Sequence, residues 1–153
     1  MQKTSILVAG LGSAALLLGA LFFQYIGGLA PCALCIMQRW PHLAAVVILA
    51  LWLATRWRFL PWLGALAALT TAGIALFHVG VEQGWWDYIS SCTQGSLAGE
   101  SAASLLPGSG AEVAPPVRCD RIAWEFLGLS MAACNAIASC GLAVLWLFGA
   151  AKR

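Results

Sequence analysis

Long apolar stretches alternate with shorter polar ones along this chain of 153 residues. Four of the apolar stretches approach the ~20 helical residues that cross the hydrocarbon core of a bilayer. The pattern therefore predicts an all-α membrane protein with a single domain, residues 1–153, folded as a four-transmembrane-helix bundle. We expect the helices at about 4–26, 34–55, 60–81 and 124–150.

The composition agrees with a chain that lies in a lipid bilayer. Hydrophobic residues make up 61% of the sequence and charged residues only 9%, whereas charged residues make up about a quarter of a typical soluble domain. The formal net charge is +2 and no basic patch is present. We therefore expect no nucleic-acid partner.

The charged residues predict the orientation of the bundle. With four spans, the basic residues of the two termini and of the 55–59 loop fall on one side, which carries no acidic residue (Lys3, Arg56, Arg58, Lys152 and Arg153). The excess of Lys and Arg in cytoplasmic segments places both termini in the cytoplasm. A short loop of about 27–33 and a long loop of about 83–123 then face outward. Within the long loop, the stretch SLAGESAASLL predicts a short helix lying on the membrane.

The six cysteines occur two by two along the sequence. Two lie in the first outer loop, two in the second and two within the fourth span (Cys32 and Cys35, Cys92 and Cys119, Cys134 and Cys140). The outer side is the oxidising side, where disulfides persist. Four outer cysteines allow three disulfide pairings. We expect the two cysteines inside the fourth helix to be small packing residues.

The stretch PCALCIMQRW places a Cys-x-x-Cys motif just before an arginine. Two thiols at this spacing close a small ring that is easily reduced and re-formed, which suits a redox centre better than a structural staple. Cys35 falls near the start of a helix, whose positive end stabilises a thiolate. Arg39 follows four residues later and therefore lies on the same helix face. It can stabilise that thiolate or another anion beside it.

Other interpretations of these residues are open at this point. The Cys-x-x-Cys motif is also found in structural disulfides, in which case the outer loops are simply stapled. A zinc site is disfavoured because the other outer cysteines form no second closely spaced pair, so we expect no metal. His42 and His78 fall at a similar depth near the outer ends of their helices. They suit the axial ligation of a b-type haem or, with Gln38 and Arg39, hydrogen bonding to the carbonyls of a quinone.

The chain resembles the disulfide bond formation protein B family of bacterial inner-membrane proteins over almost its whole length. The resemblance rests on four spans, on the pattern formed by Cys32, Cys35 and Arg39 in and after the first outer loop, and on two further cysteines in the second loop. It implies a thiol–quinone oxidoreductase with ubiquinone or menaquinone as cofactor. The implied partner is a periplasmic DsbA-like dithiol oxidase, whose reoxidation sustains disulfide formation in periplasmic proteins.

The resemblance also implies roles for the four outer cysteines. Cys92 would be attacked by the reduced partner, and Cys119 would be its disulfide mate, which passes electrons to Cys32. Cys35 would then be the thiolate beside the quinone ring.

Two further roles follow from the same resemblance. Arg39 would stabilise the Cys35 thiolate and the quinone, and His78 matches a family histidine linked to the quinone site. Gln38 stands where family members often carry an acid.

Overall fold

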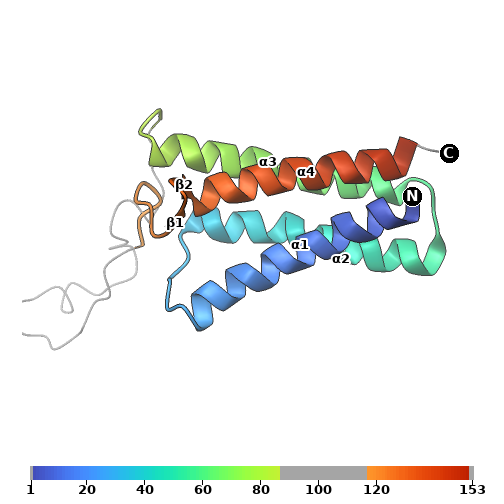
Figure 1. Cartoon of the computed structure of the whole chain (residues 1–153), viewed down its shortest axis with the longest axis horizontal. Helices are drawn as coiled ribbons and strands as arrows, with labels where there is room; N and C mark the ends of the chain where they lie inside the picture. The colour runs from blue at the N-terminus through green and yellow to red at the C-terminus, as the bar shows by residue number, and fades with distance from the viewer. Residues whose placement is uncertain (1, 87–116, 152–153) are drawn as a thin grey trace, which may run out of the picture.

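Four long helices form a bundle in this computed structural model, which describes residues 2–86 and 117–151 (Figure 1). The helices are α1 (Gln2–Tyr25), α2 (Ala33–Thr55), α3 (Leu60–Glu82) and α4 (Met131–Ala151). Each is long and apolar enough to cross a membrane, since 21 to 24 residues extend about 30 to 36 Å. The predicted fold class is therefore confirmed: the chain is a multi-pass, four-helix membrane protein.

The helices are arranged so that α1 and α3 lie diagonally, each packed against both α2 and α4. The N-terminus, the C-terminal end of α4 and the α2–α3 connection lie at one end of the bundle (Figure 1). The α1–α2 connection and the segment before α4 lie at the opposite end. This second end holds Cys32, Cys35 and Cys119. Cys92 and the expected membrane-surface helix at SLAGESAASLL lie outside the described residues.

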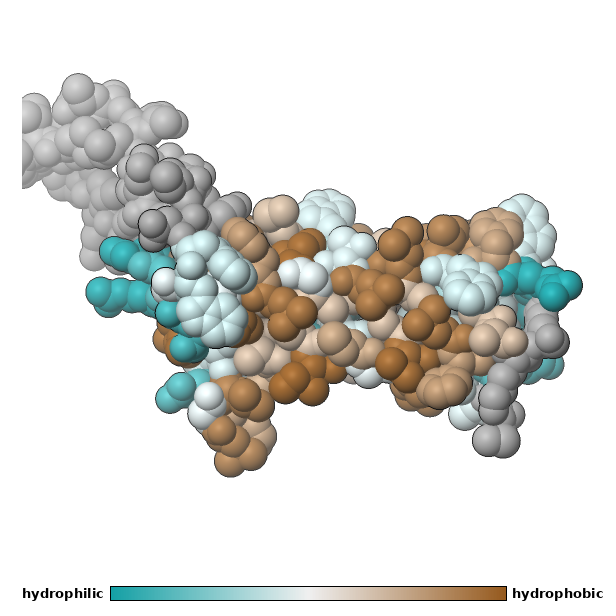
Figure 2. All heavy atoms as spheres, turned by 90° about the horizontal axis from the view of Figure 1, so that it is seen from above, coloured by the Kyte–Doolittle hydropathy of each residue, from teal (hydrophilic) through white to brown (hydrophobic). Residues whose placement is uncertain are grey.

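Small residues allow the helices to approach closely. A Cβ atom on Gly64 of α3 would lie 2.5 Å from the ring of Trp146 on α4, and Trp146 is completely buried. A Cβ on Gly10 of α1 would similarly meet Leu49 of α2 at 2.5 Å. Such packing is needed because lipid tails are as apolar as leucine, so van der Waals contact drives helix association in a membrane. Large hydrophobic side chains instead cover the outside, and strongly hydrophilic residues lie at the two ends of the face drawn in Figure 2.

The fourth helix begins later than the sequence pattern predicts. The expected start is about residue 124, whereas α4 begins at Met131 after a short antiparallel hairpin, β1 (Glu125–Phe126) and β2 (Leu129–Ser130). Leu127 and Gly128 form the turn with φ angles of 53° and 78°, a two-residue hairpin geometry that glycine favours. Ser130 then caps α4, because its hydroxyl oxygen accepts a hydrogen bond from the Ala133 amide at 3.1 Å.

Candidate active site

The Cys-x-x-Cys motif forms a compact dithiol at the start of α2. Cys32 is the N-cap residue of this helix, and its sulfur accepts a hydrogen bond from the Cys35 amide at 3.2 Å. The two sulfur atoms lie 2.8 Å apart, with the Cys32 thiol donating to Cys35. Cys32 is buried and Cys35 is half-buried. The hydrogen bond to Cys35 and the burial both raise the pKa of the Cys32 thiol. Cys32 is therefore held protonated beside a neighbouring sulfur that accepts its hydrogen.

The two cysteines of the motif face different surroundings. Cys32 belongs to a buried cluster with Leu34, Val81 and Cys119, and Cys119 is completely buried. Cys35 instead lines a cavity between the helices, and Cys32 is not among the described residues that line it. The fold thus brings Cys119, from the segment between α3 and α4, to Cys32 and leaves Cys35 facing the cavity.

The residues on either side of Cys119 form an ion pair. Arg118 donates to both carboxylate oxygens of Asp120, with Nε 2.9 Å from Oδ1. The Asp120 carboxylate raises the pKa of Arg118, and the guanidinium lowers the pKa of Asp120. The Arg118 side chain is exposed and the Asp120 side chain is partly exposed, so the pair adds little stability.

His78 of α3 lies directly beside the dithiol. Its Nε2 atom is 3.7 Å from the Cys32 sulfur and 3.8 Å from Oε1 of Glu82. Its other nitrogen, Nδ1, is 3.0 Å from Nε2 of Gln38. The histidine therefore connects the dithiol end of the bundle to the side chain of Gln38.

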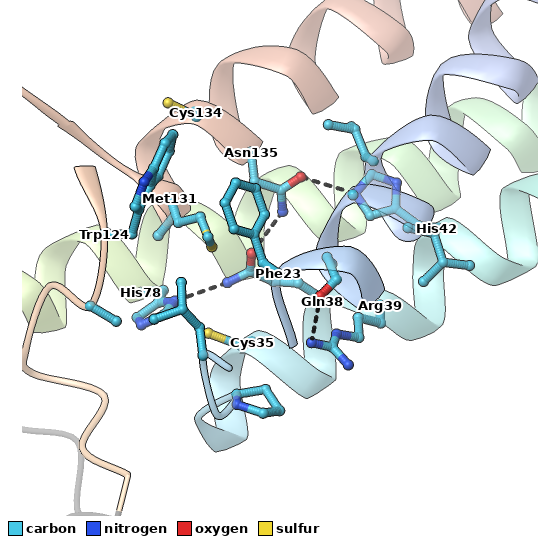
Figure 3. Close-up of a pocket in the computed structure, with 18 of the residues that line it drawn as sticks. Phe23, Cys35, Gln38, Arg39, His42, His78, Trp124, Met131, Cys134 and Asn135 are labelled. Carbon is cyan, nitrogen blue, oxygen red and sulfur yellow. Dashed lines mark hydrogen bonds between the residues drawn. The ribbon is translucent and has the colours of Figure 1, made fainter. Parts of the chain in front are cut away.

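A buried polar network continues from Gln38 across the bundle (Figure 3). Asn135 of α4 donates from Nδ2 to Oε1 of Gln38 at 2.7 Å. Its Oδ1 lies 3.0 Å from Nε2 of His42 and accepts a hydrogen bond from the Ser139 hydroxyl at 3.3 Å. His78 and His42 are thus linked through the side-chain amides of Gln38 and Asn135. A haem ligated by both histidines would have to displace these two amides.

Asn135 is the member of this network that the sequence reasoning missed. Burying an amide inside an apolar span is costly unless the amide is hydrogen-bonded. An asparagine within a fourth span that is otherwise so apolar was therefore a signal of a polar partner. Ser139, four residues later, lies on the same helix face.

Arg39 makes its hydrogen bonds to α1. Its guanidinium donates to the side chain of Gln24 and to the carbonyl oxygen of Ala20, the latter at 3.4 Å. Its buried Nε has no hydrogen-bond partner among the described residues. Arg39 nevertheless lines the same cavity as Cys35, so the two residues that share a helix face also share this space.

The cavity has a volume of about 280 Å³ and a mixed lining. Most of its wall is apolar and comes from α1, the α1–α2 connection, the segment before β1 and the start of α4, including Leu16, Phe23, Pro31, Trp124 and Met131. Its polar lining comes from the two thiols of Cys35 and Cys134 and from five further side chains (Gln38, Arg39, His42, His78 and Asn135). Such a site suits a flat apolar ring that carries a few hydrogen-bonding atoms.

A metal ion fits the same residues less well. Within the described ranges, Cys32, Cys35 and His78 have ligand atoms within 4.8 Å of one another. Two sulfurs that bind one zinc ion tetrahedrally, each at about 2.3 Å, must stand much further apart than the 2.8 Å found here. The arrangement favours sulfur–sulfur chemistry.

The fold and the site together define a membrane-embedded dithiol oxidoreductase, and comparison with known proteins agrees. The sequence profile of the disulfide bond formation protein DsbB family matches residues 2–149. The chain is 36% identical over 152 residues to "Disulfide bond formation protein B" of Methylococcus capsulatus, covering 92% of this chain and 88% of that protein. It is 29% identical to the protein of that name from Hahella chejuensis (99% and 95% covered) and 32% identical to that from Xanthomonas axonopodis pv. citri (98% and 91%).

The chain therefore belongs to the disulfide bond formation protein B family, as the resemblance predicted. It is an oxidoreductase of disulfide bond formation. No solved structure gave a significant match.

Proposed function

We propose that this protein is a thiol–quinone oxidoreductase that reoxidises a periplasmic DsbA-like dithiol oxidase and passes the electrons to membrane quinone. The observation that carries the proposal is the division of the dithiol: Cys32 packs in one cluster with Cys119, while Cys35 lines an apolar cavity inside the membrane bundle. This division supports a relay in which Cys32 exchanges with Cys119 and Cys35 reacts with an apolar acceptor. The reaction would sustain disulfide formation in periplasmic proteins.

The proposed relay moves two electrons through two disulfides. A thiolate of the partner attacks Cys92 in a Cys92–Cys119 disulfide, and the partner's second thiol then closes the partner's own disulfide and releases Cys92. Cys119 next attacks Cys32 in a Cys32–Cys35 disulfide, and Cys35 leaves as a thiolate. Cys92 attacks Cys119, restores the loop disulfide and releases Cys32. The Cys32–Cys35 pair now holds the two electrons of the partner dithiol.

The cavity residues fit a quinone, which supplies an acceptor of two electrons and two protons when it is bound. The apolar wall suits the ring. Two buried nitrogens of cavity-lining residues, Nε of Arg39 and Nδ1 of His42, have no partner among the described residues. Cys35, Gln38, Arg39, His42 and His78 would hold the quinone head group. Ubiquinone and menaquinone carry the same pair of carbonyl oxygens, so both suit these residues.

The proposed orientation puts the dithiol at the periplasmic face of the bacterial inner membrane. The opposite end of the bundle carries Lys3 at the start of α1 and Arg56 and Arg58 in the α2–α3 connection. Positive residues in short connections favour the cytoplasm. Both termini would therefore be cytoplasmic, and the two outer loops would meet the oxidising compartment in which disulfides persist.

Anaerobic quinone reduction by the purified full chain in detergent tests this function. The electron donor is a reduced, thioredoxin-like periplasmic dithiol protein, and quinol is measured by its absorbance. We expect one quinol for each donor disulfide formed, and no quinol with Cys35→Ser. Cys140→Ala is the matched control, because Cys140 lies on the exposed surface of α4. No quinol formation by the wild-type chain, with its disulfides intact, would contradict the proposal.

A further inference from the structure

The tautomer of His78 depends on the contacts of both of its ring nitrogens, Nε2 on the dithiol side and Nδ1 on the Gln38 side. Nε2 faces the Cys32 sulfur at 3.7 Å and the Glu82 carboxylate at 3.8 Å. That carboxylate already accepts a hydrogen bond from the Ser130 hydroxyl through its other oxygen. A sulfur and a carboxylate both accept hydrogen bonds. These neighbours accommodate a hydrogen on Nε2 of a neutral His78, and Nδ1 is then an acceptor.

The contacts on the Nδ1 side fit the same assignment from one side chain to the next. Because Nδ1 of His78 accepts, Gln38 must present its NH₂ group there, at 3.0 Å. The Gln38 oxygen then faces Asn135, which donates to it at 2.7 Å. The Asn135 oxygen must in turn accept from Nε2 of His42 and from the hydroxyl of Ser139. Every contact is satisfied by one direction of hydrogen bonding.

We propose that Asn135 is a positioning residue for the dithiol: through Gln38 it fixes the tautomer of His78, so that His78 presents Nε2–H to the Cys32 sulfur. Asn135 is 97 positions from Gln38 in the sequence and lies on a different helix. With the Asn135 NH₂ group on the Gln38 oxygen, the Gln38 amide cannot turn over without placing two donors face to face. In a low-dielectric interior such an arrangement is strongly disfavoured.

The consequence for thiol chemistry rests on the function proposed above. In that relay Cys32 leaves from its mixed disulfide with Cys119, and charge develops on its sulfur. An N–H donor aimed at this sulfur stabilises the leaving thiolate, because hydrogen bonds to charged groups are the stronger ones. Asn135 acts on Cys32 only through Gln38 and His78, so its effect is one of orientation.

The test uses the fact that the chain contains two histidines. Labelling histidine with ¹⁵N in the full-length protein gives four ring nitrogens, and His42→Phe assigns them. We expect hydrogen on Nε2 and none on Nδ1 of His78 in the wild type. Gln38→Glu places a carboxylate oxygen against Nδ1, so hydrogen should appear there. Asn135→Ala should leave Gln38 free to turn, and the single His78 tautomer should be lost.

A chemical readout accompanies the spectra. In the reduced protein, alkylation of Cys32 should slow roughly tenfold in Asn135→Ala, because a less well aimed Nε2–H stabilises less thiolate. Ser139→Ala is the matched control: it removes a hydrogen bond to the same Asn135 oxygen but leaves the bond to Gln38. It should keep the wild-type tautomer and alkylation rate.

Either of two results would overturn the inference. One is hydrogen on Nδ1 of His78 in the wild type. The other is a His78 tautomer that stays unchanged in both Gln38→Glu and Asn135→Ala. If one of these variants does not fold, an unchanged tautomer in the other is enough to overturn the inference. These measurements need neither quinone nor a protein partner. A failure here therefore leaves the oxidoreductase proposal standing, and a failure to reduce quinone leaves the tautomer result standing.

Discussion

His78 and Cys32 are 46 positions apart in the sequence, yet Nε2 of His78 lies 3.7 Å from the sulfur of Cys32. The contact joins the end of α3 to the start of α2. It places an ionisable ring beside the buried member of the dithiol. It also joins that sulfur to the network that crosses the bundle to α4.

Replacing this histidine should therefore weaken catalysis more than folding. His78→Phe keeps an aromatic ring but removes the N–H near Cys32 and the Nδ1 atom that accepts a hydrogen bond from the Gln38 amide. We expect the rate of quinol formation with the reduced dithiol donor to fall at least tenfold, which corresponds to about 1.4 kcal/mol of lost stabilisation. Thr70→Val, on the lipid-facing side of the same helix, should keep the wild-type rate. Equal rates in the two variants would contradict a role of His78 in thiol exchange.

Alkylation of the reduced protein should reveal the raised pKa of Cys32. Because the hydrogen bond to Cys35 and burial favour the protonated thiol, the thiolate forms only at a pH above the pKa of an ordinary thiol, and alkylation should stay slow below it. Mass spectrometry of Cys32-containing peptides across a pH series gives the midpoint. Cys35→Ala removes the hydrogen bond from the Cys32 thiol to Cys35, so the alkylation midpoint of Cys32 should move to lower pH in that variant. A wild-type midpoint at or below that of glutathione would contradict this prediction.

The four cysteines of the proposed relay should be indispensable, and the two within α4 should not be. Cys32→Ser, Cys35→Ser, Cys92→Ser and Cys119→Ser each interrupt the proposed exchange, so each should abolish quinol formation. Cys134→Ser and Cys140→Ala should leave turnover near the wild-type value. Quinol assays on the six purified variants decide the matter. Retained turnover in Cys92→Ser would contradict the assigned order of exchange.

Packing between α3 and α4 should depend on one glycine of α3 and not on another. In Gly64→Ala the new methyl group would overlap the buried Trp146 ring, where a Cβ would lie at 2.5 Å. We expect the free energy of unfolding to fall by about 1–3 kcal/mol. Gly73→Ala is the matched control, since a Cβ on Gly73 would meet no described atom within 4 Å beyond its own helix backbone. Unfolding in mixed detergent micelles measures both, and an equal loss of stability would contradict the packing argument.

Much of the architecture could be predicted from local patterns. Length and hydropathy predicted four spans because crossing a bilayer demands about 20 apolar residues whatever the neighbours are. The predicted start of α4 was too early because most residues between Trp124 and Met131 are also apolar (Trp124, Phe126, Leu127 and Leu129). The hairpin depends on positive φ angles at Leu127 and Gly128. Its signal in the sequence is short: a single glycine for the turn, followed two residues later by the capping Ser130.

The candidate site divides in the same way. The spacing of Cys32 and Cys35 and the position of Arg39 on their helix are local properties, so the sequence by itself determined that α2 begins with a dithiol and carries a cation one turn later. Only the tertiary structure decided that Arg39 bonds to Gln24 of α1, that Cys119 packs with Cys32, and that Asn135 reaches Gln38. Each of these contacts joins different segments of the chain. The choice among possible polar partners is made by which helix faces meet in the bundle, and no local pattern contains that information.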